Sequence, residues 1–226
     1  MGKDFLLEIG MEEMPAKFAP DAARQLRENA RNALAALRLN FTELYVYVTP
    51  RRLALLVRGL VEAQEDLCEE VRGPAQKAAY DEAGQPTKAA LGFAAGQGVQ
   101  VQELFTREFK GTPYVYARRF LAGERTETLL PAFGTDMIAA LRFPKPMRWG
   151  TLDVRFARPI RWLVALFGAE TVPLSYAGLT AGRISRGHRV LGGEVPIPEA
   201  GLYLETLAAQ GFVLADPDER REKIRR

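Results

Sequence analysis

Residues 43–60 read ELYVYVTPRRLALLVRGL, and this stretch predicts how the chain begins to fold. The runs ELYVYV and RLALLVRGLV are rich in β-branched, aromatic and other apolar residues, which favours two strands. Thr49, Pro50 and Arg51 separate the two runs and leave room only for a tight connection. We therefore predict two strands that pair as an antiparallel hairpin.

Helical and strand patterns surround this hairpin. Upstream, FLLEIG reads as a short strand, and apolar residues then recur every three or four positions as far as Arg38. Further helices are predicted from Thr87, Thr126 and about Pro198, with strands such as YVYARRFL between them. Because strands and helices do not alternate regularly, we expect an α+β fold: mixed or mainly antiparallel sheets with flanking helices, in two lobes.

The distribution of charge predicts where the lobes divide. Residues 1–141 carry 17 Lys and Arg against 19 Asp and Glu, whereas residues 142–189 carry 9 against 2. We therefore expect an N-terminal α+β lobe over 1–141 and a basic α+β lobe over 142–215. Eight of the nine cations in the basic block are arginines, which suit bidentate phosphate contacts. The alternative is that these arginines pair with the acidic residues between Glu62 and Glu70.

A helix start is predicted in the last eleven residues, DPDERREKIRR. Asp216 is a suitable N-cap, Pro217 suits the first helical position and Glu219 completes a capping box. We expect residues 216–226 to be the start of a truncated helix that leads into missing domains.

Composition argues against several classes of protein. The single cysteine, Cys68, excludes an internal disulfide framework, and with the single histidine, His188, it argues against a structural zinc site. The N-terminal apolar run is too short for a signal peptide, and no apolar stretch reaches the length of a membrane span. We expect a cytoplasmic protein with no membrane partner.

The sequence offers little for catalysis. It contains no phosphate-binding loop, dinucleotide fingerprint, metalloprotease motif or nucleophile elbow. His188, in SRGHR, is the one side chain that titrates near neutral pH, and Ser185 precedes it without a carboxylate nearby in sequence. We therefore predict no catalytic residue, no metal ligand and no cofactor in this chain.

The segment FPKPMRWG, residues 143–150, is a shaped connection, because its two prolines suit neither a helix interior nor a central strand. It carries Lys145, Arg148 and Trp149, which suit contact with RNA phosphates and bases. The alternative is an ordinary surface loop whose tryptophan packs into the core.

Seven segments, in order, closely resemble the beta subunit of bacterial tetrameric glycyl-tRNA synthetase. They are FLLEIGMEEMPAK, TPRRLAL, RGPA, GQPTKAALGFA, PKPMRWG, RPIRWLVALFG and RGHR, and they span nearly the whole chain. The sequence departs from the family at Met11 and Met14, where that family usually has Thr and Leu. Any role of a threonine hydroxyl at position 11 is therefore in doubt.

The resemblance implies a division of labour. In that family the alpha subunit holds the class II active site, which activates glycine with ATP and magnesium, and the beta subunit supplies tRNA binding. The implied partners are the alpha subunit and tRNA(Gly), in a heterotetramer of two alpha and two beta chains. The family's beta chain continues into a helical domain of the HD type and an anticodon-binding domain.

Three hypotheses about this chain follow. The first is a module of glycine–tRNA ligase that supports tRNA binding and assembly with alpha. The second is a docking module without RNA contact, and the third is a vestigial editing-like hydrolytic domain around His188. For the first, the candidate RNA-binding residues are Arg51, Arg52, Lys145, Arg148, Arg158, Arg186, His188 and Arg189.

Overall fold

The structure, a computed structural model, describes residues 2–151 and 153–226. It combines antiparallel sheets with packed helices, so the predicted α+β fold is confirmed. The chain divides into two compact units. Unit 1 comprises Met1–Gln64 and Glu124–Arg226, and unit 2 comprises Glu65–Gly123.

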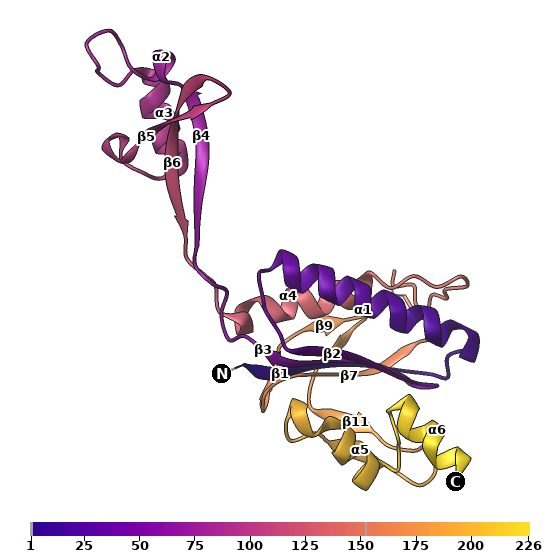
Figure 1. Ribbon diagram of the computed structural model, residues 1–226. Coiled ribbons are helices and arrows are strands. Elements are labelled where there is room, and N and C mark those ends of the chain that lie inside the picture. Colours follow the sequence, from indigo (N-terminus) through magenta and orange to yellow (C-terminus); the bar gives the residue numbers. More distant parts are fainter. Residues whose placement is uncertain (1, 152) are drawn as a thin grey trace. The chain divides into compact units, whose positions relative to one another are not determined.

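Unit 1 is built on a five-stranded antiparallel sheet with the order β2-β3-β1-β7-β8 (Figure 1). The predicted hairpin is confirmed, because β2 and β3 pair antiparallel from Thr49 and Arg52 outward. The central strand β1 pairs with β3 on one side and β7 on the other. The strands are β1 (Lys3–Met11), β2 (Glu43–Thr49), β3 (Arg52–Leu60), β7 (Ile160–Phe167) and β8 (Glu170–Thr171).

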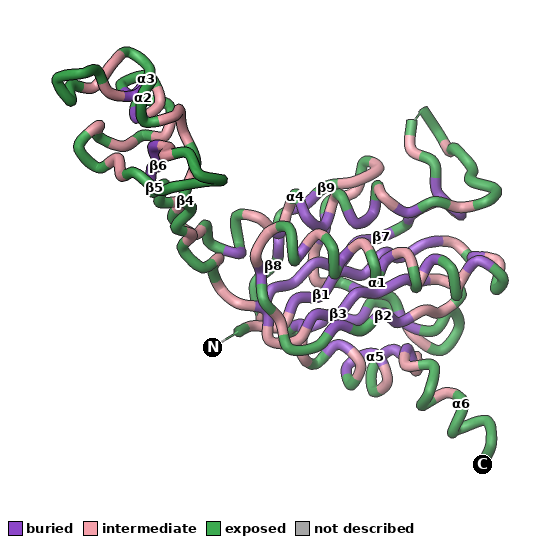
Figure 2. The backbone as a smooth tube through the Cα atoms, turned by 45° about the horizontal axis from the view of Figure 1, so that its top comes forward, coloured by how far each residue is buried: buried purple, intermediate pink, exposed green. Residues whose placement is uncertain are grey.

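Helices cover both faces of this sheet. Its central strands carry mainly apolar side chains on both faces, and these side chains must be buried. On one face, α1 (Ala19–Ala36) and α4 (Thr126–Ala139) pack over Phe5, Leu7 and Ile9. On the other face, α5 (Tyr203–Gly211) packs over a smaller core that includes Leu6. Figures 1 and 2 show the helices on either side of the sheet and the buried residues concentrated along its strands.

Short elements complete unit 1. The strands β9 (Ser175–Tyr176) and β10 (Leu179–Thr180) form one hairpin, and β11 (Ile184–Arg186) and β12 (Glu194–Pro196) form another. The 3-10 turns are η1 (Ala16–Phe18) and η3 (Ala200–Leu202). Asp216 accepts hydrogen bonds from Asp218 and Glu219 at the start of α6 (Pro217–Arg225), so the predicted cap is confirmed. Within the described residues, no helix combines the length and apolar character needed to cross a membrane.

Unit 2 is a three-stranded antiparallel sheet with the order β4-β6-β5 and two small helices. The helices pack on one face of the sheet, around Ala79, Ala90 and Val115. Its elements are β4 (Leu67–Ala75), α2 (Gln76–Ala79), α3 (Lys88–Gln97), η2 (Val101–Glu103), β5 (Phe105–Phe109) and β6 (Thr112–Leu121).

The division into units differs from the expected division at residue 141. The reason is that β7, which lies in the basic block, pairs with β1 along seven residue pairs and so belongs to the first sheet. The basic block is therefore part of unit 1, and the second unit is the segment 65–123, which interrupts it. Local charge and composition carry no information about this long-range pairing.

Candidate functional site

Five of the eight candidate residues come together at one end of the sheet of unit 1. The connection between β2 and β3 supplies Arg51 and Arg52, and the segment after β11 supplies His188 and Arg189. Two adjoining hollows, of about 330 and 310 Å³, share Arg51, His188 and Arg189 in their linings. Arg186 lines the second hollow. The sequence positions of these two segments differ by about 135 residues, and the fold alone joins them.

Backbone contacts fix the first of these segments. The amide of Met11 donates to the carbonyl of Arg51 at 2.9 Å, and the amide of Met14 donates to the carbonyl of Pro50 at 2.7 Å. The stretch that leaves β1 therefore holds the hairpin connection in place. Both contacts use backbone atoms, so they do not require the threonine that the family usually has at position 11.

Close backbone packing fixes the second segment. The amide of His188 donates to the carbonyl of Gly211 at 2.6 Å, and the amide of Gly187 donates to the carbonyl of Gly193 at 2.8 Å. A Cβ on Gly187 would lie 2.7 Å from the carbonyl oxygen of Gly211, and one on Gly192 would lie 2.8 Å from the same atom. Three backbones meet here too closely for any side chain, so glycine is required at both positions.

Three guanidinium groups surround the indole ring of Trp162 on β7. Their central carbons lie 5.6 Å (Arg51), 5.9 Å (Arg52) and 5.6 Å (Arg186) from the ring centroid, within the range of cation–π interactions. The ring lies against Gly10 on β1, where a Cβ would overlap it at 1.9 Å. The tryptophan therefore organises the cations at this end of the sheet.

Arg52 is a buried residue of this cluster, with a side chain that is only 2% exposed. Its Nη2 donates to the carbonyl of Arg186, and its Nη1 lies 3.8 Å from Oε2 of Glu8, which is itself fully buried. Almost none of its surface is open to a ligand. Arg52 is thus better explained as a structural residue than as an RNA contact.

Glu8 is the centre of a buried polar network that the sequence analysis missed. Its Oε1 accepts hydrogen bonds from Nε1 of Trp162 and, at 2.7 Å, from Oγ of Ser185, and its Oε2 accepts one from the hydroxyl of Tyr203. Burial, reinforced by the charge of Glu8, raises the pKa of Tyr203 well above its ordinary value. A glutamate inside the apolar run FLLEIG was the available signal, because a charge in a buried strand requires partners.

The surroundings of His188 and Ser185 do not favour hydrolysis. Nδ1 of His188 accepts backbone amide hydrogens from Val190 (3.3 Å) and Leu191 (3.2 Å), so the neutral ring carries its proton on Nε2. Neither nitrogen then offers a free lone pair to a substrate proton. Ser185 is fully buried and donates to Glu8. Within the described residues, no group of three His, Cys, Asp or Glu side chains could hold a metal ion.

The other three candidates lie in the connection between α4 and β7 and line neither hollow. Arg148 pairs with Asp153, and Nη1 of Arg158 donates to its neighbour's carbonyl, of Ala157, at 3.0 Å. Lys145 is exposed. The ring of Trp149 is half-buried and packs against the main core, as the alternative for this segment expects of the tryptophan.

Two of the acidic residues between positions 62 and 70 pair with cations outside the basic block. Glu62 pairs with Lys3, and Glu70 pairs with Arg107 and Arg118. Arg189 instead lies 3.3 Å from Glu13 in an exposed ion pair, which typically contributes under about 1 kcal/mol. Because this ion pair is weak, Arg189 remains available to an anion that binds it more tightly than Glu13 does.

Comparison with known proteins identifies the family. Residues 5–226 match the sequence profile of the family described as glycyl-tRNA synthetase beta subunit. The chain is 56% identical over 224 residues to the glycine–tRNA ligase beta subunit of Desulfitobacterium hafniense. It is 51% identical over 223 residues to that of Halalkalibacterium halodurans and 45% identical over 222 residues to that of Bacillus subtilis.

These alignments cover 98–99% of this chain but only 32% of each relative. The chain thus spans about a third of the length of the curated relatives it matches. Because the profile extends over almost every residue, the chain belongs to the glycyl-tRNA synthetase beta subunit family.

Proposed function

We propose that this chain contributes tRNA binding to a glycine–tRNA ligase, through Arg51, Arg186 and Arg189 around the paired hollows. The observation that carries the proposal is the convergence of these cations, from two distant segments, on one surface beside Trp162. Arginines spaced around a concave surface suit the phosphates of an RNA backbone. Lys145, Arg148 and Arg158 are proposed as separate contacts on the connection before β7.

We also propose that the alpha subunit carries out the chemistry of aminoacylation. We infer that alpha uses ATP and magnesium to activate glycine, that it assembles with beta in a cytoplasmic heterotetramer, and that tRNA(Gly) is the RNA. The engaged nitrogens of His188 and the buried Ser185 support a binding role for this chain over an editing-like hydrolytic one.

A docking role for the same region has its own supporting observation. Val190 and Leu191, directly after Arg189, are 82% and 67% exposed, and Phe212 beside the first hollow is 59% exposed. Neighbouring apolar side chains at a loop tip suit a protein partner such as the alpha subunit. Docking and tRNA binding therefore require an experiment that separates them.

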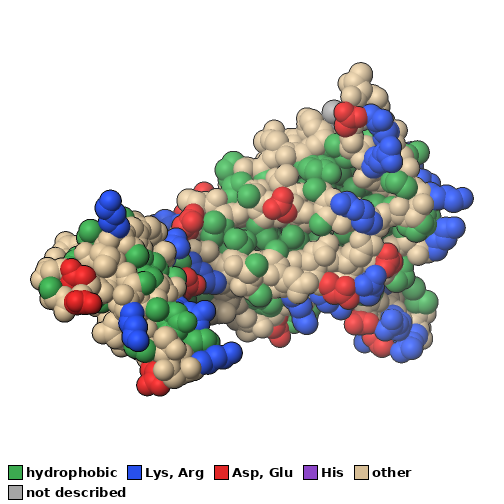
Figure 3. All heavy atoms as spheres, turned by 90° about the horizontal axis from the view of Figure 1, so that it is seen from above, with side chains coloured by type: hydrophobic (Ala, Val, Ile, Leu, Met, Phe, Trp, Pro, Cys, Tyr) green, Lys and Arg blue, Asp and Glu red, His purple; other side chains and the backbone are tan. Residues whose placement is uncertain are grey.

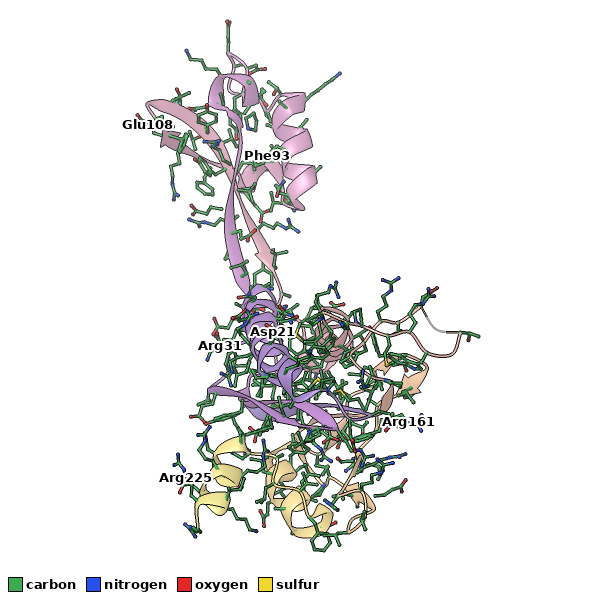
Figure 4. The ribbon with its side chains drawn as sticks, turned by 90° about the vertical axis from the view of Figure 1, so that its right-hand side faces the viewer. Asp21, Arg31, Phe93, Glu108, Arg161 and Arg225 are labelled. Atoms are coloured by element: carbon green, nitrogen blue, oxygen red, sulfur yellow. The ribbon has the colours of Figure 1, made fainter. Side chains whose placement is uncertain are left out.

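The experiment uses the assembled ligase and two sets of substitutions. Arg186→Gln with Arg189→Gln should weaken tRNA binding by about 1–3 kcal/mol in total and lower the salt dependence of binding, because two phosphate contacts are lost. Val190→Ser with Leu191→Ser should leave tRNA affinity unchanged. Arg31→Gln is the control, because Arg31 is an exposed arginine on α1 outside both hollows (Figure 4).

Affinity for tRNA is measured at several salt concentrations, and assembly with alpha is measured by size-exclusion chromatography. If the arginine variants assemble normally and bind tRNA as the Arg31→Gln variant does, the proposal is wrong. If they bind tRNA normally but fail to assemble with alpha, the region is a docking surface.

A further inference from the structure

The sheet of unit 2 has one face covered by helices and one face without them. On the covered face, Val115 packs with Ala79 and Ala90, and Phe93 of α3 lies so close to Gly73 that a Cβ there would be 2.5 Å from its ring (Figure 4). Side chains alternate between the faces of a strand. The neighbours of Val115 along β6, Tyr114 and Tyr116, therefore belong to the other face.

That other face alternates aromatic and basic side chains. Phe105 pairs with Tyr116, and Arg107 pairs with Tyr114, across β5 and β6. Arg72 pairs with Tyr116, and Glu70 pairs with Arg118, across β4 and β6. An uncovered face of an antiparallel sheet is ordinarily polar, so a row of aromatic rings here needs a reason. We call these residues the aromatic–arginine face: Arg72, Phe105, Arg107, Phe109, Tyr114, Tyr116 and Arg118.

The rings and guanidinium groups of this face lie against one another. The central carbon of Arg72 lies 4.3 Å from the ring centroid of Phe109 and 5.2 Å from that of Tyr114. That of Arg118 lies 5.0 Å from Phe105, whose ring stacks on Tyr116 at 5.8 Å between centroids. The face thus offers flat aromatic and cationic surfaces together, the two groups on which unpaired bases stack.

The face is open and positively charged. Phe109 is 42% exposed, and Phe120, further along β6 on the same face, is 64% exposed, whereas Tyr116 is buried at 9% exposed, so the outer rings are the ones open to a ligand. Arg72, Arg107 and Arg118, with Lys110 beside Phe109, give four cations, against the single carboxylate of Glu70. Figure 3 shows basic, acidic and hydrophobic side chains interspersed over the surface of this unit. The positive charge suits a polyanion, and the aromatic rings suit a nucleic acid whose bases are unpaired and exposed.

We propose that the aromatic–arginine face of unit 2 binds a single-stranded segment of RNA, by stacking bases on its rings and guanidinium groups. It is a second RNA surface, separate from the hollows of unit 1, and it rests on the proposed function only in making tRNA the natural source of the strand. Duplex RNA keeps its bases stacked on each other, so the face should prefer unpaired nucleotides. Its recognition should tolerate changes of sequence, because every base has a π-face.

The test measures binding of a fluorescent single-stranded RNA, about ten nucleotides long, to the 226-residue chain by polarisation. Phe109→Ala and Arg72→Gln should each weaken binding about tenfold. Arg119→Gln is the matched control, because Arg119 follows Arg118 along β6 and so belongs to the opposite face. Thermal unfolding of each variant shows whether its fold is intact.

A second readout uses Cys68, the single cysteine of the chain, which is exposed and pairs with Phe120 across β4 and β6. A photo-crosslinker attached to Cys68 should label the single-stranded RNA, and an excess of the unlabelled strand should suppress the labelling. Duplex RNA of the same length should crosslink more weakly.

Equal affinities for the Arg72→Gln, Phe109→Ala and Arg119→Gln variants, with intact folds, would overturn the inference. It would also be overturned if the two face variants lost alpha-subunit binding while RNA affinity stayed constant, because the face would then be a protein interface. If this inference fails, the proposal for the hollows of unit 1 still stands, because the Arg186→Gln and Arg189→Gln variants test that proposal separately with tRNA.

Discussion

At the scale of single residues, one buried carboxylate connects the core to the candidate site. Glu8 contacts groups from β7, β11, α5 and β3, the last through Arg52. Arg52 in turn donates to the backbone of Arg186, a surface cation of the site. A buried charge is costly without partners, and Glu8 accepts hydrogen bonds from Trp162, Ser185 and Tyr203. The position of Arg186 thus depends on residues that no ligand can reach.

The hydroxyl of Tyr203 gives a test of this network. Tyr203→Phe leaves one lone pair of buried Glu8 without its donor, so we expect the free energy of unfolding at neutral pH to fall by about 1–3 kcal/mol. Urea denaturation measures this loss. Tyr45→Phe is the control, because that ring is 38% exposed and its hydroxyl contacts an exposed glutamate. Equal stability of the Tyr203→Phe variant and the natural chain would show that the network contributes nothing to folding.

The same residue makes stability depend on alkaline pH. Because burial raises the pKa of Tyr203 in the folded chain, the unfolded tyrosine loses its proton first, above about pH 10. The free energy of unfolding should therefore decrease as the pH rises from there towards the folded pKa. Tyr47, whose pKa burial raises to about 12, contributes in the same direction. The Tyr203→Phe variant should show a shallower decrease than the natural chain.

At the scale of elements, local signals predicted local structure well. The hairpin of β2 and β3 was predicted from two apolar runs and a proline-containing connection. The Asp216 cap was predicted because its hydrogen-bond partners lie within the next three residues of the sequence. A helix was predicted from Thr126, and α4 does begin there, with Arg125 at its N-cap. The hydroxyl of Thr126 donates to the carbonyl of Val61, a partner far away in sequence.

Patterns that need a partner strand were missed. The alternation FTREF and YVYARRF was in the sequence, but only the pairing of β5 with β6 shows that its rings and arginines share one open face. Likewise, nothing near Arg52 in the sequence marks it as buried, because its partner Glu8 lies on the neighbouring strand β1. The candidate site was predicted as a set of cations, and the fold decided which of them face solvent.

In the connection before β7, we expect Lys145 and Arg148 to contact RNA and Trp149 to stabilise the fold. Lys145→Ala with Arg148→Ala should weaken tRNA binding by about 1–3 kcal/mol in total, if these cations meet phosphates. Trp149→Ala should instead lower the free energy of unfolding by about 2 kcal/mol, because its ring is half-buried against the core. Salt-dependent tRNA affinity and thermal unfolding measure the two effects. An unchanged affinity in the double variant, with its fold intact, would leave this segment without an RNA role.

At the scale of the whole molecule, the chain leaves unit 1 after Gln64 and returns to it at Glu124, and these two residues are neighbours in unit 1. Ala63 and Arg125 form an antiparallel bridge, and the amide of Gln64 donates to the carbonyl of Glu124 at 2.9 Å. Beside them, the amide of Thr126 donates to the carbonyl of Glu62 at 3.0 Å. Unit 1 therefore completes this backbone pairing from its own residues, and the two ends of unit 2 are already brought together.

This arrangement predicts that unit 2 can be removed without unfolding unit 1. Replacing residues 65–123 by a turn of about four residues should suffice to join Gln64 to Glu124, because they lie as near as the ends of a hairpin. The shortened chain should unfold in one cooperative transition by circular dichroism. It should lose single-stranded RNA binding and keep the tRNA affinity that depends on Arg186 and Arg189. Loss of the cooperative transition would show that unit 1 needs the insertion to fold, whereas retained binding of the short strand would place that binding outside the aromatic–arginine face.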